Sequence, residues 1–218
     1  MNRRLQSLKK RLKRLGKLPL KHGILAVYKL FRLLFRVNPK VVLFESYLGR
    51  SYSGNPKYIY EEFVAQGLDR AYKCVWILNN PRTDIPGKCM KVKKLGICYF
   101  YYMAIGGFWV FDTRQPEYIV KRKNVVYIQT WHGTPLKKLA LDMDVLNMAG
   151  DTNLERYTKS FIKESARWDY LISQNRYSTE IFRRAFAFEK TMLEIGYPRN
   201  DLLVNRNNAE TILALKKK

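Results

Sequence analysis

Cysteine and the common nucleotide-binding motifs are scarce or absent in this sequence. The 218-residue chain has three cysteines, an odd number without metal-ligand spacing, at Cys74, Cys89 and Cys98. They indicate buried or free thiols in a reducing compartment rather than a disulfide framework or a metal site. The sequence contains no glycine-rich nucleotide fingerprint and no phosphate-binding P-loop. We therefore expect no metal and no cofactor.

Acidic residues are missing from the amino end. Residues 1–40 hold 13 Lys or Arg and no Asp or Glu, whereas the rest of the chain holds 28 basic and 18 acidic residues. The net charge of +23 is thus concentrated at this end, with a milder basic bias elsewhere. Such a charge indicates polyanionic partners, namely nucleic acid, anionic lipid or phosphate-bearing substrates. The segment also lacks the uninterrupted apolar core and small-residue cleavage site of a secretory signal, so none is expected.

Residues 3–36 are predicted to form two basic amphipathic helices. Leucines recur at three- and four-residue spacing in the first, Gly16 and Pro19 interrupt it, and the second runs over about residues 21–36. Neither can span a bilayer, which needs about 20 apolar residues. A basic helix without acids suits the surface of an anionic membrane, and the alternatives are an RNA-binding arm or a partner-docking helix. The residues expected to contact lipid are Arg11, Lys13, Arg14, Lys29, Phe31, Arg32 and Phe35.

Beyond residue 40 the sequence alternates between short apolar runs and helical patterns. An apolar fraction of 47% with 14% aromatic residues is typical of a globular protein. Strand, loop and helix in repeated succession predict an α/β fold, with a Rossmann-like parallel sheet over residues 39–203. Asn55 is expected to cap one helix, and Asp151 or Thr152 another. The predicted strands are residues 41–44, 73–78, 89–92, 108–111, 125–130, 169–173 and 191–195.

Residues 95–111 carry no charge, so a membrane-spanning segment is an alternative there. The stretch is just short of the usual span length, contains three glycines and lies inside the alternation of strands and helices. We therefore predict a buried helix over residues 96–104, a turn at Gly106 and Gly107, and a strand up to Phe111.

Three segments at the carboxyl ends of predicted strands carry chemistry, and in a parallel sheet they share one edge. Residues 45–55 offer glycines and hydroxyls beside a helix amino end, where an anion binds, and Arg50 for a phosphate. Residues 131–135 offer His132, whose ordinary pKa near 6.5 lets it take a proton from an alcohol. From the residues alone, loop chemistry and helix capping remain alternatives. The candidate binding residues are Ser46, Arg50, Ser51, Asn55, Trp131, Gly133, Thr134, Arg199, Asn200 and Asp201.

These segments resemble the CDP-glycerol glycerophosphotransferase family, which comprises the teichoic acid primases and glycerol- or ribitol-phosphate polymerases of Gram-positive bacteria. The matching stretches are residues 45–56, 129–137 and 196–201, in that order. The run Trp-His-Gly-Thr-Pro at residues 131–135 is the most specific of them. Residues 168–173 also fit the family's pattern.

The resemblance implies the amino-terminal, acceptor-side domain of a GT-B glycosyltransferase-like fold. It also implies a monotopic transferase of cell wall biosynthesis on the cytoplasmic face of the plasma membrane. His132 would be the base that deprotonates the terminal hydroxyl of a lipid-linked glycerol phosphate acceptor. That hydroxyl would attack the β-phosphate of CDP-glycerol and expel CMP. The choice between glycerol and ribitol phosphate, and between priming and polymerising, stays open.

Three parts of the chain are expected: membrane-associating helices at 1–38, the acceptor-side domain at 39–203, and a charged helical tail at 204–218 that begins a linker. In the family, a donor-binding domain follows the motif at 196–201, and this sequence ends at Lys218. We therefore expect most of the CDP-glycerol site to lie in a domain absent from this sequence. A complementary donor-domain chain is a possible partner.

Two other functions compete with this hypothesis. One is a non-catalytic basic protein that binds nucleic acid or a membrane, with the amino-terminal segment as its contact surface. The sequence has no recognisable nucleic-acid-binding motif, and the turn around His132 would have no purpose in such a protein, so no nucleic-acid partner is expected. The other is a structural or regulatory role at the membrane without catalysis.

Overall fold

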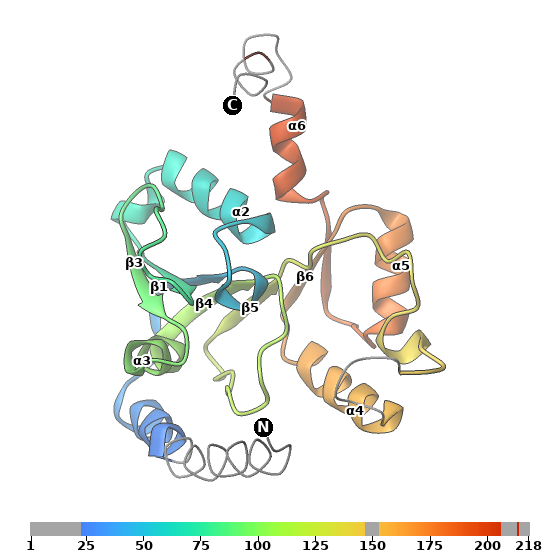
Figure 1. The fold of residues 1–218 in the computed structure, drawn as a ribbon, viewed down its shortest axis with the longest axis horizontal. Coiled ribbons are helices and arrows are strands. Elements are labelled where there is room, and N and C mark those ends of the chain that lie inside the picture. The colour runs from blue at the N-terminus through green and yellow to red at the C-terminus, as the bar shows by residue number, and fades with distance from the viewer. Residues whose placement is uncertain (1–22, 147–152, 206–212, 214–218) are drawn as a thin grey trace, which may run out of the picture.

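The computed structural model describes residues 23–146, 153–205 and 213 (Figure 1). Seven strands form one sheet in the order β3-β2-β1-β4-β5-β6-β7, and every neighbouring pair is parallel. The predicted α/β class, the parallel sheet and all seven predicted strands are therefore confirmed, with ends that differ by a few residues. The strands are β1 (Asn38–Glu45), β2 (Lys73–Leu78), β3 (Cys89–Lys93), β4 (Gly106–Phe111), β5 (Val126–Gln129), β6 (Tyr170–Ser173) and β7 (Thr191–Glu194).

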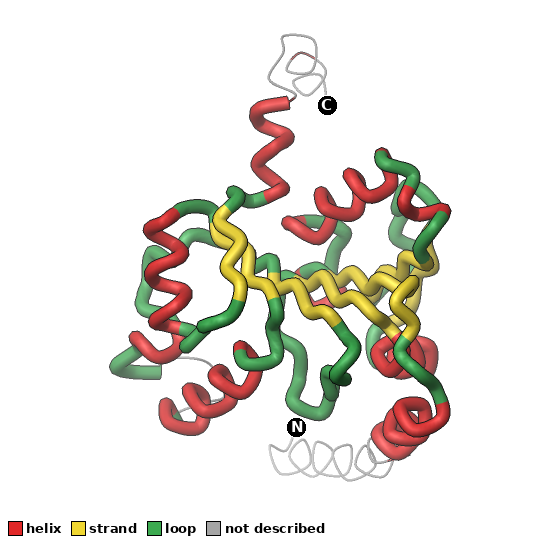
Figure 2. Tube along the Cα trace, turned by 180° about the vertical axis from the view of Figure 1, so that it is seen from behind, coloured by secondary structure: helices red, strands yellow, loops and turns green. Residues whose placement is uncertain are grey.

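The chain builds the sheet outward from its middle. It runs from β1 to β2 and β3 on one side, and then returns to place β4 on the other side of β1. The direction of winding thus reverses between β1 and β4. Helices cover both sides of the sheet, as the view from behind shows (Figure 2). Besides a helix at residues 23–34, they are α2 (Gly54–Ala65), α3 (Ile97–Ile105), α4 (Leu154–Ser165), α5 (Arg176–Ala185) and the short α6 (Asp201–Asn205).

Alternate side chains of the central strands pack into two core layers, one on each face of the sheet. On one side, Phe44 of β1 lies 5.2 Å from Tyr60 of α2 and 5.5 Å from Trp76 of β2, measured between ring centroids. On the other side, Leu43 belongs to the core cluster that contains Met103 of α3. Because successive side chains of a strand point to opposite faces, apolar runs without alternation give strands buried on both sides.

The turn predicted at Gly106 and Gly107 is wrong, because both residues lie inside β4 and follow α3 directly. A Cβ atom on Gly107 would lie 2.6 Å from the carbonyl oxygen of Asn38, and one on Gly106 would lie 2.7 Å from the side chain of Leu43. The two glycines therefore let β4 approach β1 closely, a constraint between strands that resembles a turn signal in the sequence.

Both predicted helix caps are also wrong. Asn55 lies within the first turn of α2, whose N-cap is Ser53 without a side-chain hydrogen bond. Asn153 is the N-cap of α4, and its side chain accepts a hydrogen bond from the backbone N–H of Arg156. Asp151 and Thr152, the expected caps, lie outside the described residues.

Residues 97–111 form α3 and β4 in the core, which confirms the predicted buried helix. Across the described parts of the chain, no helix is both long and apolar enough to cross a membrane. The helix at residues 23–34 packs onto α3 through Phe31, whose ring centroid lies 5.6 Å from that of Tyr101. The predicted first helix, with Arg11, Lys13 and Arg14, lies outside the described residues.

We predict that Gly107→Ala lowers the free energy of unfolding by about 1–3 kcal/mol, because the new methyl group meets the backbone of β1 rather than a movable side chain. Urea unfolding followed by circular dichroism measures this loss. Gly23→Ala is the matched control, since nothing lies within 4 Å of a Cβ atom there. Equal midpoints for the two variants would contradict the assigned role of Gly107.

Candidate active site

The reversal between β1 and β4 is a topological switch point, and open α/β sheets bind ligands at the carboxyl edge beside such a point. Glu45 ends β1, Ser46 follows it, and Asp112 follows β4. All three are buried. A hydrophobic core does not require buried polar side chains, so three of them at a topological switch point indicate a functional role.

Asp112 holds the loop after β1 in place. Its carboxylate accepts hydrogen bonds from the Ser46 hydroxyl at 2.7 Å and from the Tyr47 N–H at 2.9 Å. Burial raises the pKa of Asp112 to about 6, although these two hydrogen bonds oppose the rise. The Ser46 oxygen also lies 2.6 Å from the Ser53 carbonyl oxygen. A hydroxyl has one proton, so Ser46 cannot donate to both oxygens at once. Both contacts are hydrogen bonds only when Asp112 is protonated and donates to Ser46, while Ser46 donates to Ser53.

Asn55 joins the three segments that the sequence singles out. Its side-chain nitrogen donates to the carbonyl oxygens of Thr130 and Trp131, at 3.0 Å each. Its side-chain oxygen accepts from the backbone N–H of Arg199 at 3.4 Å. The residue is buried within the first turn of α2. The expected convergence of residues 45–55, 131–135 and 196–201 at one edge is therefore present in the structure.

The turn after β5 is held in an unusual conformation. Trp131 has a φ of 51°, a region that bulky residues rarely adopt, and its ring packs 4.6 Å from that of Phe186. Its backbone N–H donates to the side chain of Gln129 at 3.0 Å. The hydroxyl of Tyr197 donates to the carbonyl oxygen of Gly133 at 2.8 Å, which fixes the far side of the turn. The strained tryptophan is anchored, and the next residue is turned outward.

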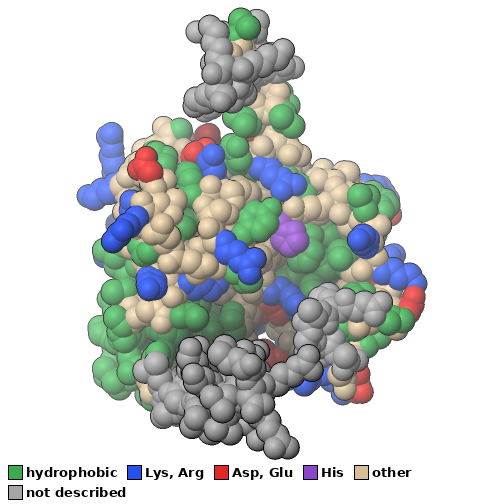
Figure 3. Space-filling model, viewed as in Figure 1, with side chains coloured by type: hydrophobic (Ala, Val, Ile, Leu, Met, Phe, Trp, Pro, Cys, Tyr) green, Lys and Arg blue, Asp and Glu red, His purple; other side chains and the backbone are tan. Residues whose placement is uncertain are grey.

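That next residue, His132, presents an exposed imidazole (Figure 3). Its ring stacks on that of Trp131, with centroids 4.6 Å apart. Desolvation beside the crowded turn, and then the positive charge of Arg199, lower the pKa of His132 below 6.5. In the described part of the chain, neither ring nitrogen has a hydrogen-bond partner. The lowered pKa favours the neutral imidazole, whose ring nitrogens are open to a ligand.

The other predicted residues surround this centre at different depths. Arg50, Thr134, Asn200 and Asp201 are exposed. The guanidinium of Arg199 lies 5.4 Å from the ring centroid of Tyr197. The Ser51 and Ser53 hydroxyl oxygens are 2.7 Å apart, and the Thr134 hydroxyl accepts from Gln174 at 2.6 Å. Of the predicted lipid contacts, Lys29 is exposed, Phe31 and Phe35 lie against Tyr101, and Arg32 lies 5.3 Å from the Tyr28 ring centroid.

A cavity of about 570 Å³ opens beside His132, and the sequence did not predict it. Its walls come from the loop after β4, including Arg114, and from Tyr157 and Phe161 of α4. The position of Arg114, two residues beyond Asp112 at the end of a central strand, was the available signal. The contribution of α4 had none, because that helix reaches the cavity only through the tertiary fold.

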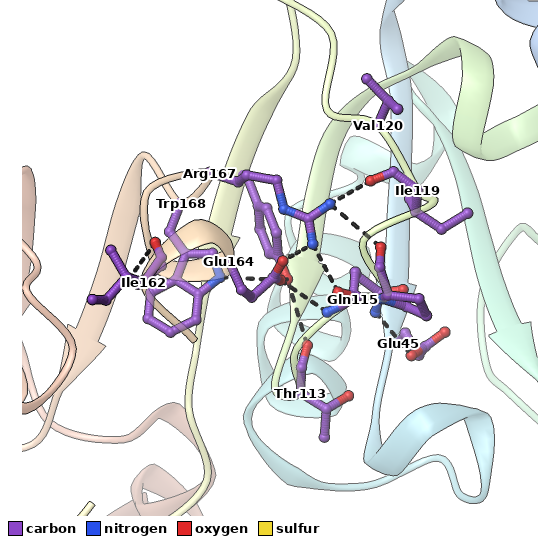
Figure 4. A network of polar contacts seen from close by, with 12 residues as sticks. Glu45, Thr113, Gln115, Ile119, Val120, Ile162, Glu164, Arg167 and Trp168 are labelled. Atoms are coloured by element: carbon purple, nitrogen blue, oxygen red, sulfur yellow. Dashed lines mark hydrogen bonds and ion pairs between the residues drawn. The ribbon is translucent and has the colours of Figure 1, made fainter. Parts of the chain in front are cut away.

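A buried network sets the shape of this cavity (Figure 4). Glu164 of α4 accepts hydrogen bonds from the Gln115 N–H at 2.9 Å and from the Tyr127 hydroxyl at 3.2 Å, and it pairs with Arg167. Arg167 in turn donates to the carbonyl oxygen of Gln115 at 2.7 Å. The side chain of Gln115 donates to Glu45 at 3.1 Å. The network ties α4 and the loop after β4 to the carboxyl end of β1.

Comparison with known proteins identifies the family of this chain. A family model described as CDP-Glycerol:Poly(glycerophosphate) glycerophosphotransferase matches residues 26–218. A teichoic acid poly(glycerol phosphate) polymerase of Bacillus spizizenii (strain W23) is 41% identical over 212 residues, which are 93% of this chain and 53% of that protein. One of Staphylococcus epidermidis is 50% identical over 179 residues, which are 81% of this chain and 24% of that protein.

A solved structure of the wall teichoic acid polymerase TagF superposes with a TM-score of 0.81 at 43% identity. The match covers 96% of this chain and 51% of the TagF chain. This likeness confirms the expected GT-B-like α/β architecture. The chain spans about half the length, or less, of these relatives. With a family match over most of its length, the chain belongs to the CDP-glycerol:poly(glycerophosphate) glycerophosphotransferase family.

Proposed function

We propose that this domain is the acceptor-binding, base-carrying half of a transferase that builds a glycerol phosphate polymer of the cell wall. The observation that carries the proposal is the exposed His132 on a strained turn, which Asn55 holds against the segment of Arg199. Relatives between 39% and 50% identical are named for glycerol phosphate, whereas the ribitol-phosphate primase is 26% identical. Glycerol phosphate is therefore favoured as the transferred unit.

The proposed reaction begins when an imidazole nitrogen of His132 removes the proton from the terminal hydroxyl of a lipid-linked glycerol phosphate acceptor. The oxygen attacks the β-phosphorus of CDP-glycerol, the new P–O bond forms, and the bond to the CMP oxygen breaks. In this proposal, Arg50 and Arg199 bind phosphate oxygens, and Ser51, Thr134, Asn200 and Asp201 bind hydroxyls at the same edge of the sheet. CDP-glycerol would bind chiefly in a second domain that faces this edge.

We also propose that the enzyme acts as a peripheral protein on the cytoplasmic face of the plasma membrane. The helix at residues 23–34 leaves Leu30, Leu33 and Leu34 exposed, with 74% of Leu33 and 66% of Leu34 in contact with solvent. Lys29 on the same helix and the following Arg36 are also exposed. An apolar stripe with basic residues beside it is what an anionic membrane surface binds.

The transferase proposal predicts CMP release from CDP-glycerol and a lipid-linked acceptor, with a complementary donor-domain chain supplied. His132→Ala should slow this release about 100-fold or more, because general-base catalysis is lost. Unfolding midpoints of the two proteins should agree, since the imidazole is exposed. Release by His132→Ala at the unaltered rate would refute the role of His132, and no release by either protein would refute the transferase.

The environment of His132 gives a test on the chain alone. Its pKa, followed by NMR in a protein whose other histidine, His22, is replaced by Gln, should lie below 6.5. Arg199→Gln should raise this pKa, because a positive neighbour that disfavours the imidazolium is removed. At pH 7 the neutral, proton-accepting form would dominate in both proteins. A pKa above 6.5 in the starting protein would contradict the described setting of His132.

The membrane proposal predicts that the double variant Leu33→Glu, Leu34→Glu binds anionic liposomes at least about tenfold more weakly, because two exposed leucines no longer enter the lipid surface. Cosedimentation with phosphatidylglycerol vesicles measures the binding. Leu203→Glu is the matched control, since Leu203 is 71% exposed on α6, away from the amino-terminal helix. Equal binding by all three proteins would contradict the proposal.

A further inference from the structure

Arg114 is a half-buried cation that lies against aromatic rings. Its guanidinium carbon lies 4.3 Å from the ring centroid of Phe161 and 5.2 Å from that of Tyr157. Burial lowers the pKa of Arg114, and the neighbours that oppose this shift are the tyrosines Tyr157 and Tyr127. Within the described ranges, no carboxylate pairs with this guanidinium. Buried charges are ordinarily paired, because their lost hydration is costly, so an anion would complete the site.

Arg114 also stands at the junction of two cavities. The first, of about 570 Å³, begins at His132. The second, of about 660 Å³, continues along α4 to Lys159 and Lys163. Arg114, Glu117, Tyr157 and Ser160 line both. A ligand that touches His132 at one end can therefore pass Arg114 and run on along α4.

Charge along this path favours an anionic chain. The outer cavity is lined by Arg114, Arg156, Lys159 and Lys163 against two carboxylates, Glu117 and Glu155. Glu155 is engaged by Lys159 at 2.6 Å. Lys163 is exposed one turn further along α4 and has no ion pair within the described residues. Positive charge thus remains in excess in the outer cavity. The inner cavity is lined by Arg114 and the carboxylates Glu117 and Glu164, of which Glu164 pairs with Arg167.

The floor of the inner cavity offers unused polar atoms. The Thr113 hydroxyl and the side-chain oxygen of Gln115 are buried and have no hydrogen-bond partner among the described residues, and Gln115 is 4% exposed. Both residues line the cavity beside His132. Buried polar atoms are normally satisfied, and hydroxyl groups of a ligand or a bridging water would satisfy these. Cations for phosphates and acceptors for hydroxyls suit a polyol phosphate.

We propose that the growing polyol phosphate chain of the acceptor lies in this groove, with its terminal hydroxyl at His132, one phosphodiester on Arg114 and a later one near Lys163. This inference rests on the proposed function and names the path of its acceptor substrate. Arg114 acts as a binding residue next to the reacting end. The guanidinium carbon lies over the rings of Tyr157 and Phe161, and a planar guanidinium can bind two phosphate oxygens at once.

The test uses soluble oligo(glycerol phosphate) of one to four units, with binding to the full chain measured by isothermal titration calorimetry. Arg114→Gln should weaken every oligomer about tenfold, whereas Lys163→Gln should weaken only the longer ones. Arg183→Gln, at an exposed arginine of α5, is the matched control and should change none. Arg114→Lys should lose less affinity than Arg114→Gln, since lysine keeps the positive charge but lacks the paired N–H donors of the guanidinium.

Oligomers that bind Arg114→Gln and Arg183→Gln equally well would overturn the groove, as would the absence of any oligomer binding. A further contrary result is RNA of equal charge that binds as tightly as the oligomers and loses the same affinity in Arg114→Gln, Lys163→Gln and Arg183→Gln. That result would show a general polyanion surface and would also overturn the groove. If Arg114→Gln fails to fold, Arg114→Lys and the length dependence of Lys163→Gln decide the question. CMP release that depends on His132 but not on Arg114 would refute the groove alone and leave the transferase standing.

Discussion

The buried amide of Asn55 is the interaction on which the site depends. It joins segments 75 and 144 residues apart in the sequence, through Thr130 and Arg199 respectively. Each of its partners is a backbone group at the carboxyl edge of the sheet, so the amide fixes main chain rather than one side chain. A buried carbonyl left without a donor costs about 1–3 kcal/mol. The amide therefore makes the convergence of the three motifs part of the folded state, before any ligand arrives.

The parallel sheet supplies the place where this amide can act. All strand ends of one sense meet at one edge, and the reversal between β1 and β4 opens that edge between Glu45 and Asp112. Both carboxylates are buried, and their environments are different. Lys94 pairs with Glu45 at 2.7 Å, whereas Asp112 has neutral hydrogen-bond donors and a raised pKa. This end of the sheet thus holds one carboxylate that is paired with Lys94 and one whose pKa burial raises to about 6.

The sequence predicts features that depend on local pattern and misses those that depend on contact between distant elements. Short runs of mostly apolar residues identified the strands, and Gly133 and Pro135 after Trp131 identified the turn of His132. Gly107 was read as a turn because its contact, the backbone of Asn38, is 69 positions away in the sequence. Asn55 was read as a helix cap because asparagine caps helices locally, whereas its true partners belong to other motifs. The Arg114 cavity was missed because α4 forms its wall.

The amino-terminal helix and the groove of Arg114 are two basic surfaces with different proposed roles. The net charge of +23 does not distinguish them. A lipid-linked polymer requires a protein that stays at the membrane and also holds a flexible anionic chain. Lys29 and Arg36 are exposed near Leu33, so their attraction for an anionic lipid would be screened by salt within a Debye length of about 8 Å. Arg114 is partly desolvated, so its attraction for a phosphate is screened less. Under these proposals, selection among anions therefore rests on the half-buried guanidinium of Arg114, which lines the same cavity as His132, and the charge of the amino end serves mainly to keep the protein at the membrane surface.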